Sequence, residues 1–171
     1  MKFTFHVSPS IKNNLSTQRI MKELSLSLLV VFVAALIYYA SAWGASAALH
    51  CVLLLACSLI TTLVCESIFA KIMKKDVKTF LKNSFGWVSA IILTLMVPVN
   101  MSCYAVIIAT VFAIVLAKLL FGGFGQNIFN PAAVGRAVIL QAFTGVSVGL
   151  ITQATPTTVI ASAYHWLPAN A

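Results

Sequence analysis

Long apolar runs, separated by short polar or basic segments, make up most of the chain. The first run has 20 residues, and at about 1.5 Å of rise per residue a helix of that length crosses a hydrocarbon core of about 30 Å. The pattern predicts an all-α, polytopic transmembrane helix bundle of about five spans, at residues 24–43, 45–70, 86–99, 103–121 and 132–151. The third run is short and ends at Pro98, so we expect a tilted or partly re-entrant span.

The composition agrees with a membrane protein. Of the 171 residues, 61% are hydrophobic and 8% are charged, whereas an average soluble domain has about 25% charged residues. So few charged side chains would not cover the surface of a soluble globule. The composition therefore excludes a soluble enzyme, a disordered tail and a small disulfide-stapled protein.

The basic residues predict the orientation. The chain has 11 Lys and Arg against 3 Asp and Glu, a net charge of +8. All of the cations precede the first run, separate the second from the third, or lie near the junction of the fourth and fifth. By the positive-inside rule, we expect a cytoplasmic N-terminal segment (1–23), a cytoplasmic basic loop (71–84) and an extracytoplasmic tail (152–171) that looks truncated. The cations favour contact with anionic lipid headgroups rather than nucleic acid.

The first run has two interpretations. Ser16 and Thr17 offer hydroxyl groups that could cap a helix entering the membrane. A signal peptide is the alternative, because the N-terminus is basic and Ala40-Ser41-Ala42 resembles a cleavage site. The length of the run and the spans that follow it favour a membrane helix.

A glycine-rich break separates the fourth and fifth runs. It contains Gly122, Gly123 and Gly125, followed by Asn127 and Asn130. Irregular backbone at membrane depth is tolerated only where it is buried in protein or lines a cavity. The free N–H groups and the two amides therefore predict a binding site for a polar or anionic ligand.

Arg136 lies about one turn into the helix that follows. A charge at the centre of a bilayer costs about 2.5–3.5 kcal/mol, so we expect a phosphate, a carboxylate or buried carbonyls as its partner. The alternative is a simple loop with an interfacial arginine that sets the orientation.

Other polar residues in the apolar runs leave alternatives open. Glu66 is a candidate cation ligand, or it pairs with Lys71 or another nearby lysine, or it reaches water. Lys118 is placed to extend to the membrane surface. His50 lies among apolar residues, where a hydrogen-bonded packing role is more common than metal ligation.

The remaining polar motifs predict neither a catalytic group nor a metal site. The cysteines Cys51, Cys57, Cys65 and Cys103 are interpreted as packing residues, with a metal or iron–sulfur role shared with another subunit as the alternative. The hydroxyl-rich stretch at residues 152–158 is either a turn that ends a helix or a modification site outside the membrane.

Residues 122–137 read GGFGQNIFNPAAVGRA, which resembles the signature of the NqrB/RnfD family. These proteins are membrane subunits of the sodium-pumping NADH:quinone reductase and of the Rnf ferredoxin:NAD oxidoreductase. The SP dipeptide at residues 8–9 and TQRIM at residues 17–21 resemble the start of the RnfD members of the family, from the Rnf electron-transport complex, more closely. The resemblance covers the N-terminal half of the family's bundle, in the bacterial inner membrane.

The resemblance implies FMN joined by a phosphoester to a threonine on the outer face, attached by a separate flavin transferase. The matching stretch runs from Thr152 to Thr155, so Thr155 would carry the FMN. Riboflavin is a second candidate cofactor. The glycine loop and Arg136 would help to build a cofactor or subunit-contact site on the inner side.

The chain departs from the family pattern at two positions near this threonine. Gln153 stands where the family has glycine, and Gly149 stands where it has an acid. The resemblance implies a membrane subunit of an Rnf-type complex that passes electrons through flavin and is coupled to Na⁺ or H⁺ movement. A transporter or channel half-bundle without redox activity, or a structural remnant, is the alternative.

Overall fold

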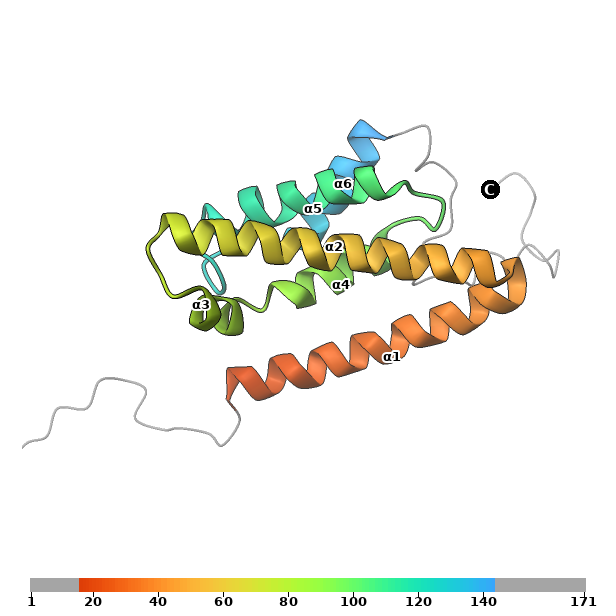
Figure 1. Cartoon of the computed structure of the whole chain (residues 1–171), viewed down its shortest axis with the longest axis horizontal. Coiled ribbons are helices and arrows are strands. Elements are labelled where there is room, and N and C mark those ends of the chain that lie inside the picture. Colours follow the sequence, from red (N-terminus) through yellow and green to blue (C-terminus); the bar gives the residue numbers. More distant parts are fainter. Residues whose placement is uncertain (1–15, 144–171) are drawn as a thin grey trace, which may run out of the picture.

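The computed structural model describes residues 16–143, which form a bundle of helices (Figure 1). No β-strand occurs within that range, and the prediction of an all-α bundle is confirmed. The helices are α1 (Thr17–Trp43), α2 (Ala45–Ile72), α3 (Val77–Ser84), α4 (Gly86–Met96), α5 (Cys103–Val111), the π-helix η1 (Phe112–Leu119) that continues α5, and α6 (Pro131–Ala142).

The first two helices form a long antiparallel hairpin (Figure 1). They have 27 and 28 residues, and both are long and apolar enough to cross a membrane. Ser16 caps α1 as predicted, because its side-chain oxygen accepts a hydrogen bond from the Arg19 N–H at 3.3 Å. The turn between the helices requires Gly44, which has φ +88°.

The third span is broken. Together α3 and α4 are apolar and long enough for a span, but they meet at a bend of 48°. Phe85 lies at the bend with φ +51°, a left-handed conformation that is strained for a bulky residue. The basic loop expected at residues 71–84 therefore contains a helix, α3, whose N-terminus is capped by Asp76.

The α5–η1 helix is shorter than the first two and covers Cys103–Leu119. In η1 the backbone hydrogen bonds reach one residue further back than in an α-helix, and the Leu120 N–H bonds to Val115 O at 3.0 Å. Such wide turns are rare and are often found at functional sites.

The α2 helix lies at the centre of the bundle and packs against α1, α4 and α5. One buried apolar cluster joins α2 and α4 to α5 and α6, and a second joins α1 to α2 and α4. The outer surfaces of α1 and α2 are also apolar, with Val30, Ile37 and Ile60 among their exposed side chains. Apolar residues on both the inside and the outside are typical of helices that face lipid.

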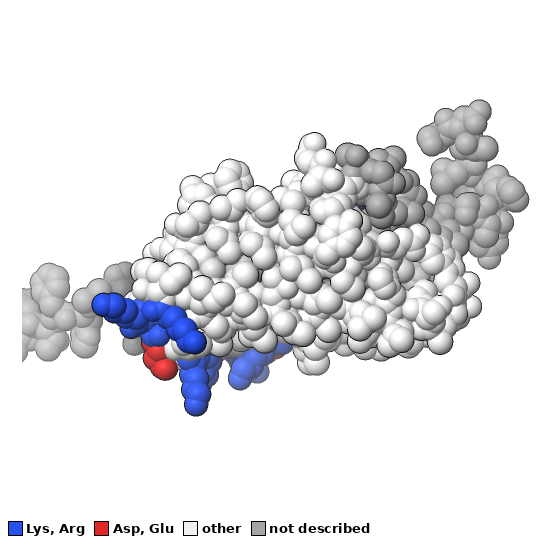
Figure 2. Space-filling view, turned by 45° about the horizontal axis from the view of Figure 1, so that its top comes forward, with Lys and Arg blue, Asp and Glu red and all other residues white. Residues whose placement is uncertain are grey.

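The exposed cations gather at one end of the bundle (Figure 2). The start of α1, the end of α2 and all of α3 lie at that end, and the glycine loop reaches it as well (Figure 1). The start of α1, the basic loop and the junction of the fourth and fifth runs, where the charge pattern gathers the cations, therefore share one end of the structure.

Candidate functional site

A buried ion pair joins α2 to η1. Lys118 Nζ lies 2.7 Å from Glu66 Oε1, and the two side chains are 3% and 1% exposed. The Ser84 hydroxyl, at the end of α3, donates to the same carboxylate oxygen at 2.5 Å. Lys118 thus does not extend to the membrane surface as expected, because the Glu66 carboxylate holds it inside the bundle.

This pairing was not predicted from the sequence. The candidates there were lysines close to Glu66 in the chain, whereas the partner lies 52 positions further along. One feature of the sequence agrees with the pairing. Glu66 and Lys118 each stand close to the end of a predicted span, at ends that the charge pattern places on the same side of the membrane, so packing of the two spans brings them to a similar depth.

The ion pair ends a line of buried polar side chains on α2. Ser58, Thr62 and Glu66 are four residues apart and share one face of the helix. The Ser58 hydroxyl donates to Ala90 O at 3.3 Å, and Thr110 Oγ1 lies 3.3 Å from Ser58 Oγ. The line joins polar groups of α2, α4 and α5 across an apolar bundle.

Thr62 is the unusual member of this line. It is 1% exposed, and its Oγ1 has no hydrogen-bond partner among the residues that the structure describes. A buried hydroxyl without a partner costs about 1–3 kcal/mol. One turn from the carboxylate of Glu66, this oxygen is free to accept or donate a hydrogen bond, or to bind a cation.

Gly86 lets the broken span approach the ion pair closely. A Cβ atom at this position would lie 2.6 Å from Glu66 Cδ and 2.7 Å from Thr62 Cγ2, both far inside van der Waals contact. The absence of a side chain at Gly86 therefore allows α4 to pack directly on the polar face of α2.

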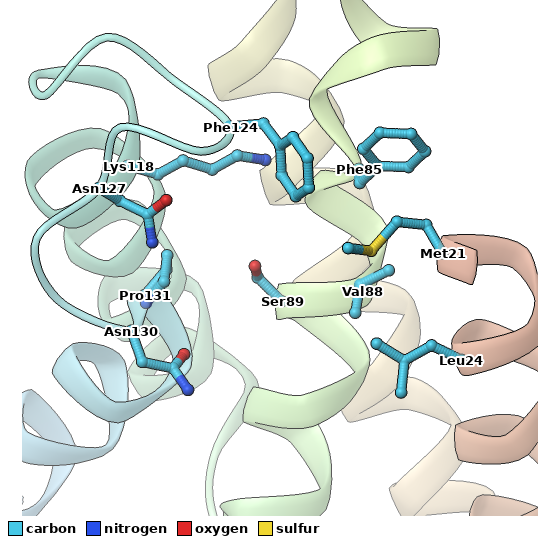
Figure 3. A pocket seen from close by; sticks show the side chains of 10 residues that line it. All are labelled: Met21, Leu24, Phe85, Val88, Ser89, Lys118, Phe124, Asn127, Asn130 and Pro131. Carbon is cyan, nitrogen blue, oxygen red and sulfur yellow. The ribbon is translucent and has the colours of Figure 1, made fainter. Parts of the chain in front are cut away.

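A pocket of about 300 Å³ lies beside the ion pair, between α1, α4, η1 and the glycine loop. Figure 3 shows Lys118 entering from one side beside Phe124, while Met21 and Leu24 of α1 close the opposite side. The Phe85 and Phe124 rings pack edge to face at 4.9 Å. The full lining is Met21, Leu24, Phe85, Val88, Ser89, Lys118, Phe124, Asn127, Asn130 and Pro131.

The glycine loop is irregular, as its composition predicts. The φ values of Gly122, Gly123 and Gly125 are +108°, +97° and +86°. Residues that have a side chain rarely adopt such positive values. Asn127 Nδ2 donates to Phe129 O, and Asn130 Oδ1 accepts from the Ala132 N–H, both at 3.0 Å. The two asparagines line the pocket and also hold the loop and the start of α6 in shape.

Arg136 lies on α6 and is not part of the pocket lining. Its buried Nη1 has no hydrogen-bond partner in residues 16–143, so the expected anion or carbonyl partner is not found there. The structure thus brings the predicted asparagines together with Lys118 but leaves Arg136 elsewhere.

The remaining candidates have structural roles or lie outside the described range. His50 Nε2 is 2.8 Å from Met101 O, in agreement with the predicted packing role. Within residues 16–143, no three His, Cys, Asp or Glu side chains form a group that could hold a metal ion. Thr152 and Thr155 lie outside the described residues, so the flavin attachment site stays a prediction.

Comparison with known proteins identifies relatives along almost the whole chain. The profile of the NQR2, RnfD, RnfE family matches residues 4–167. The D subunit of the ion-translocating oxidoreductase complex of Tolumonas auensis is 35% identical over 143 residues, and that of Shigella boydii is 34% identical. These matches cover 84% of this chain but 39% and 38% of the two relatives. The chain therefore belongs to the NQR2, RnfD, RnfE family and spans about two fifths of the length of these relatives.

Proposed function

We propose that this chain serves as a membrane subunit of an ion-translocating oxidoreductase complex of the Rnf type. The observation that carries the proposal is the family match over residues 4–167, together with relatives that bear this name. The buried Glu66–Lys118 pair also supports it, because ionisable groups kept inside a membrane bundle commonly mark ion or proton pathways. The other subunits of such a complex are the proposed partners.

The proposed electron carrier is FMN, bound through a phosphoester to Thr155 by a flavin transferase. The threonine hydroxyl supplies the acceptor oxygen, and flavin supplies the redox chemistry when it is bound. Ferredoxin and NAD are the proposed electron donor and acceptor of the whole complex. The support for Thr155 is the TQAT stretch at residues 152–155 and its resemblance to the family pattern.

The pocket beside the ion pair is proposed as a second cofactor site, with riboflavin as its candidate, or as a contact for a neighbouring subunit. Its chemistry fits a flavin ring. Phe85 and Phe124 provide aromatic surfaces, and Asn127 and Lys118 provide N–H donors for ring carbonyl oxygens. The residues of this chain would bind and orient the ring and exclude water from it.

The proposed ion path follows the buried polar line from Ser58 to the Glu66–Lys118 pair. A cation or proton arriving at Glu66 would weaken the hold of the carboxylate on Lys118, because it neutralises the charge that keeps the ammonium group buried. The proposed location is the bacterial inner membrane, with the basic end of the bundle and the N-terminus in the cytoplasm, as the positive-inside rule predicts.

The flavin assignment is tested by expressing the full chain together with its flavin transferase. Flavin bound covalently survives a denaturing gel and fluoresces there. We expect fluorescence from the parent chain, its loss in Thr155→Ala, and its retention in the matched variants Thr157→Ala and Thr158→Ala. A parent band without fluorescence would refute the attachment of FMN to this chain.

A transporter or channel without redox activity is the second candidate. The 48° break in the third span, next to a buried ion pair, favours it because many transporters build their sites from broken helices. This alternative predicts solute flux across liposomes that contain the purified chain, together with no flavin absorbance.

A further inference from the structure

The lysines around α3 form a cationic surface that the proposed function does not use. Lys71 lies in the last turn of α2, Lys74 and Lys75 lie in the segment between α2 and α3, and Lys78 and Lys82 are one helical turn apart on α3. All five side chains are exposed. Figure 2 shows the blue side chains gathered at this end, while most of the visible remainder of the described surface carries no charge.

Protein acids do not neutralise these lysines. In the described part of the chain, none of the five forms an ion pair. Glu23 is paired with Arg19 on α1 at 3.0 Å. Asp76 is engaged as the cap of α3, because its Oδ2 accepts hydrogen bonds from the Thr79 hydroxyl at 2.6 Å and from the Thr79 N–H at 3.1 Å. Five lysines against the single carboxylate of Asp76 leave this surface with a net positive charge.

The position of this surface relative to the membrane indicates which kind of molecule it binds. Ile72 is 71% exposed and lies between Lys71 and the exposed Met73, at the end of a helix long and apolar enough to cross a membrane. Exposed apolar side chains at such a position face the acyl chains. Lysines next to them in the sequence lie at the level of the lipid headgroups.

A recess of about 350 Å³ gives this surface a defined shape. It is lined by Lys75, Asp76, Thr79, Phe80 and Asn83. Phe80 packs against Phe69 with ring centres 6.1 Å apart, and Lys75 Nζ lies 5.8 Å from the centre of the Phe80 ring. The Asn83 side chain is held by a hydrogen bond from Gln18 of α1 at 3.2 Å. The recess thus has an aromatic wall, with one lysine and the carboxylate of Asp76 at its rim.

We propose that α3 and the turn before it bind one anionic phospholipid of the surrounding bilayer. The phosphodiester group binds Lys75, the lysine that lines the recess, while the other lysines of the surface add attraction at longer range, and the glycerol and upper acyl carbons cover Phe80. The lipid is favoured over an acidic protein because the lysines adjoin the lipid-facing side chains of α2. This inference does not depend on the redox function.

The experiment measures the binding of fluorescent phosphatidylglycerol and phosphatidylcholine, with identical acyl chains, to the full chain in mixed detergent micelles. We expect the parent chain to prefer phosphatidylglycerol. The combined variant Lys75→Gln, Lys78→Gln and Lys82→Gln should lower the affinity for phosphatidylglycerol by about 100-fold and leave that for phosphatidylcholine unchanged.

Two matched variants test whether the loss of affinity depends on the position of the lysines rather than on the total charge of the chain. Lys2→Gln, Lys12→Gln and Lys22→Gln together remove the same charge from positions outside the Lys71–Lys82 segment and should keep the preference. Lys75→Arg, Lys78→Arg and Lys82→Arg together keep the local charge and should also keep it. Helix content by circular dichroism checks that each variant folds.

Several outcomes would overturn the proposal. One is a parent chain that binds both lipids equally, and another is a triple glutamine variant that keeps the parent preference. Displacement of the lipid by an equal concentration of glycerophosphoglycerol would show a site for free phosphate groups instead. Displacement by a polyglutamate peptide at that concentration would show a site for an acidic protein.

Discussion

Glu66 and Lys118 bring two opposite charges into a bundle whose other buried residues are mostly apolar. Removing both charges from water is costly, and their attraction offsets that cost only with good geometry and further hydrogen bonds. The hydroxyl of Ser84 supplies such a bond to the shared oxygen. Such a pair stabilises a fold little compared with apolar packing, which agrees with the proposed role of Glu66 in ion movement.

Neutralising one partner should destabilise the protein more than neutralising both. Glu66→Gln leaves the ammonium of Lys118 buried without a counter-charge, and we expect the free energy of unfolding to fall by about 3–5 kcal/mol. The double variant Glu66→Gln with Lys118→Met should recover a large part of this loss. Unfolding in mixed detergent, followed by circular dichroism, measures both.

The exposed pair Arg19–Glu23 provides the control for this comparison. Both side chains are more than half exposed, so Glu23→Gln should cost no more than about 0.3–0.5 kcal/mol. An effect of Glu66→Gln as small as that of Glu23→Gln would show that the buried pair is not formed in the protein.

Gly86 and Gly135 offer a second comparison. Gly86→Ala should destabilise the protein by about 1–3 kcal/mol, since the new Cβ meets the carboxylate of Glu66 and the methyl group of Thr62. Gly135→Ala should cost less, because its Cβ would approach only apolar atoms, Leu93 Cδ1 at 2.9 Å and Ala113 Cβ at 3.1 Å, whereas the Glu66 carboxylate is held in the ion pair. Thermal unfolding of the two variants tests the difference, and equal losses would contradict the close approach of α4 to α2.

Among the secondary-structure elements, those marked by a long apolar run or by clustered glycines could be predicted from the sequence. The long runs predict α1 and α2, and the glycines predict the irregular loop before α6. The helix α3 was missed because it has only eight residues, two of them lysines, so it lacks the long apolar run that marked the other helices. Its capping pair, Asp76 and Thr79, was the available indication.

The α3 helix should respond to acid through its cap. Hydrogen bonds from the Thr79 hydroxyl and N–H lower the pKa of Asp76 below its ordinary value. A lowered pKa means that the ionised carboxylate stabilises the folded helix above the pKa of the unfolded chain, and that this contribution is lost as pH falls through the folded pKa.

Hydrogen exchange measures this effect directly. We expect the protection factors of the α3 amides to decrease in that acidic range in the parent chain. Asp76→Ala should give low protection at every pH, without the acid-induced decrease. The same pH dependence in Asp76→Ala as in the parent would assign the change to another group.

In the whole molecule, contacts between segments that are far apart in the sequence form the ion pair and the pocket, which could not be predicted from the sequence. The pairing of α2 with η1 brings Glu66 to Lys118, and the bend at Phe85 brings α4 and the glycine loop to the same place. The prediction of a binding loop was made from local composition, but the pocket also needs α1, which closes its far side. Such contacts depend on how the helices pack, which a single sequence does not reveal.

The most direct test of the proposed function is redox-driven ion uptake by inverted membrane vesicles. Vesicles from cells that lack this chain are compared with vesicles complemented by the parent chain, with reduced ferredoxin and NAD supplied and both sodium and proton uptake followed. We expect uptake to be lost without the chain, restored by the parent, and restored poorly by the Glu66→Gln variant where that variant reaches the membrane in normal amounts. Uptake that is equal with and without the chain would contradict its role in an ion-translocating oxidoreductase complex.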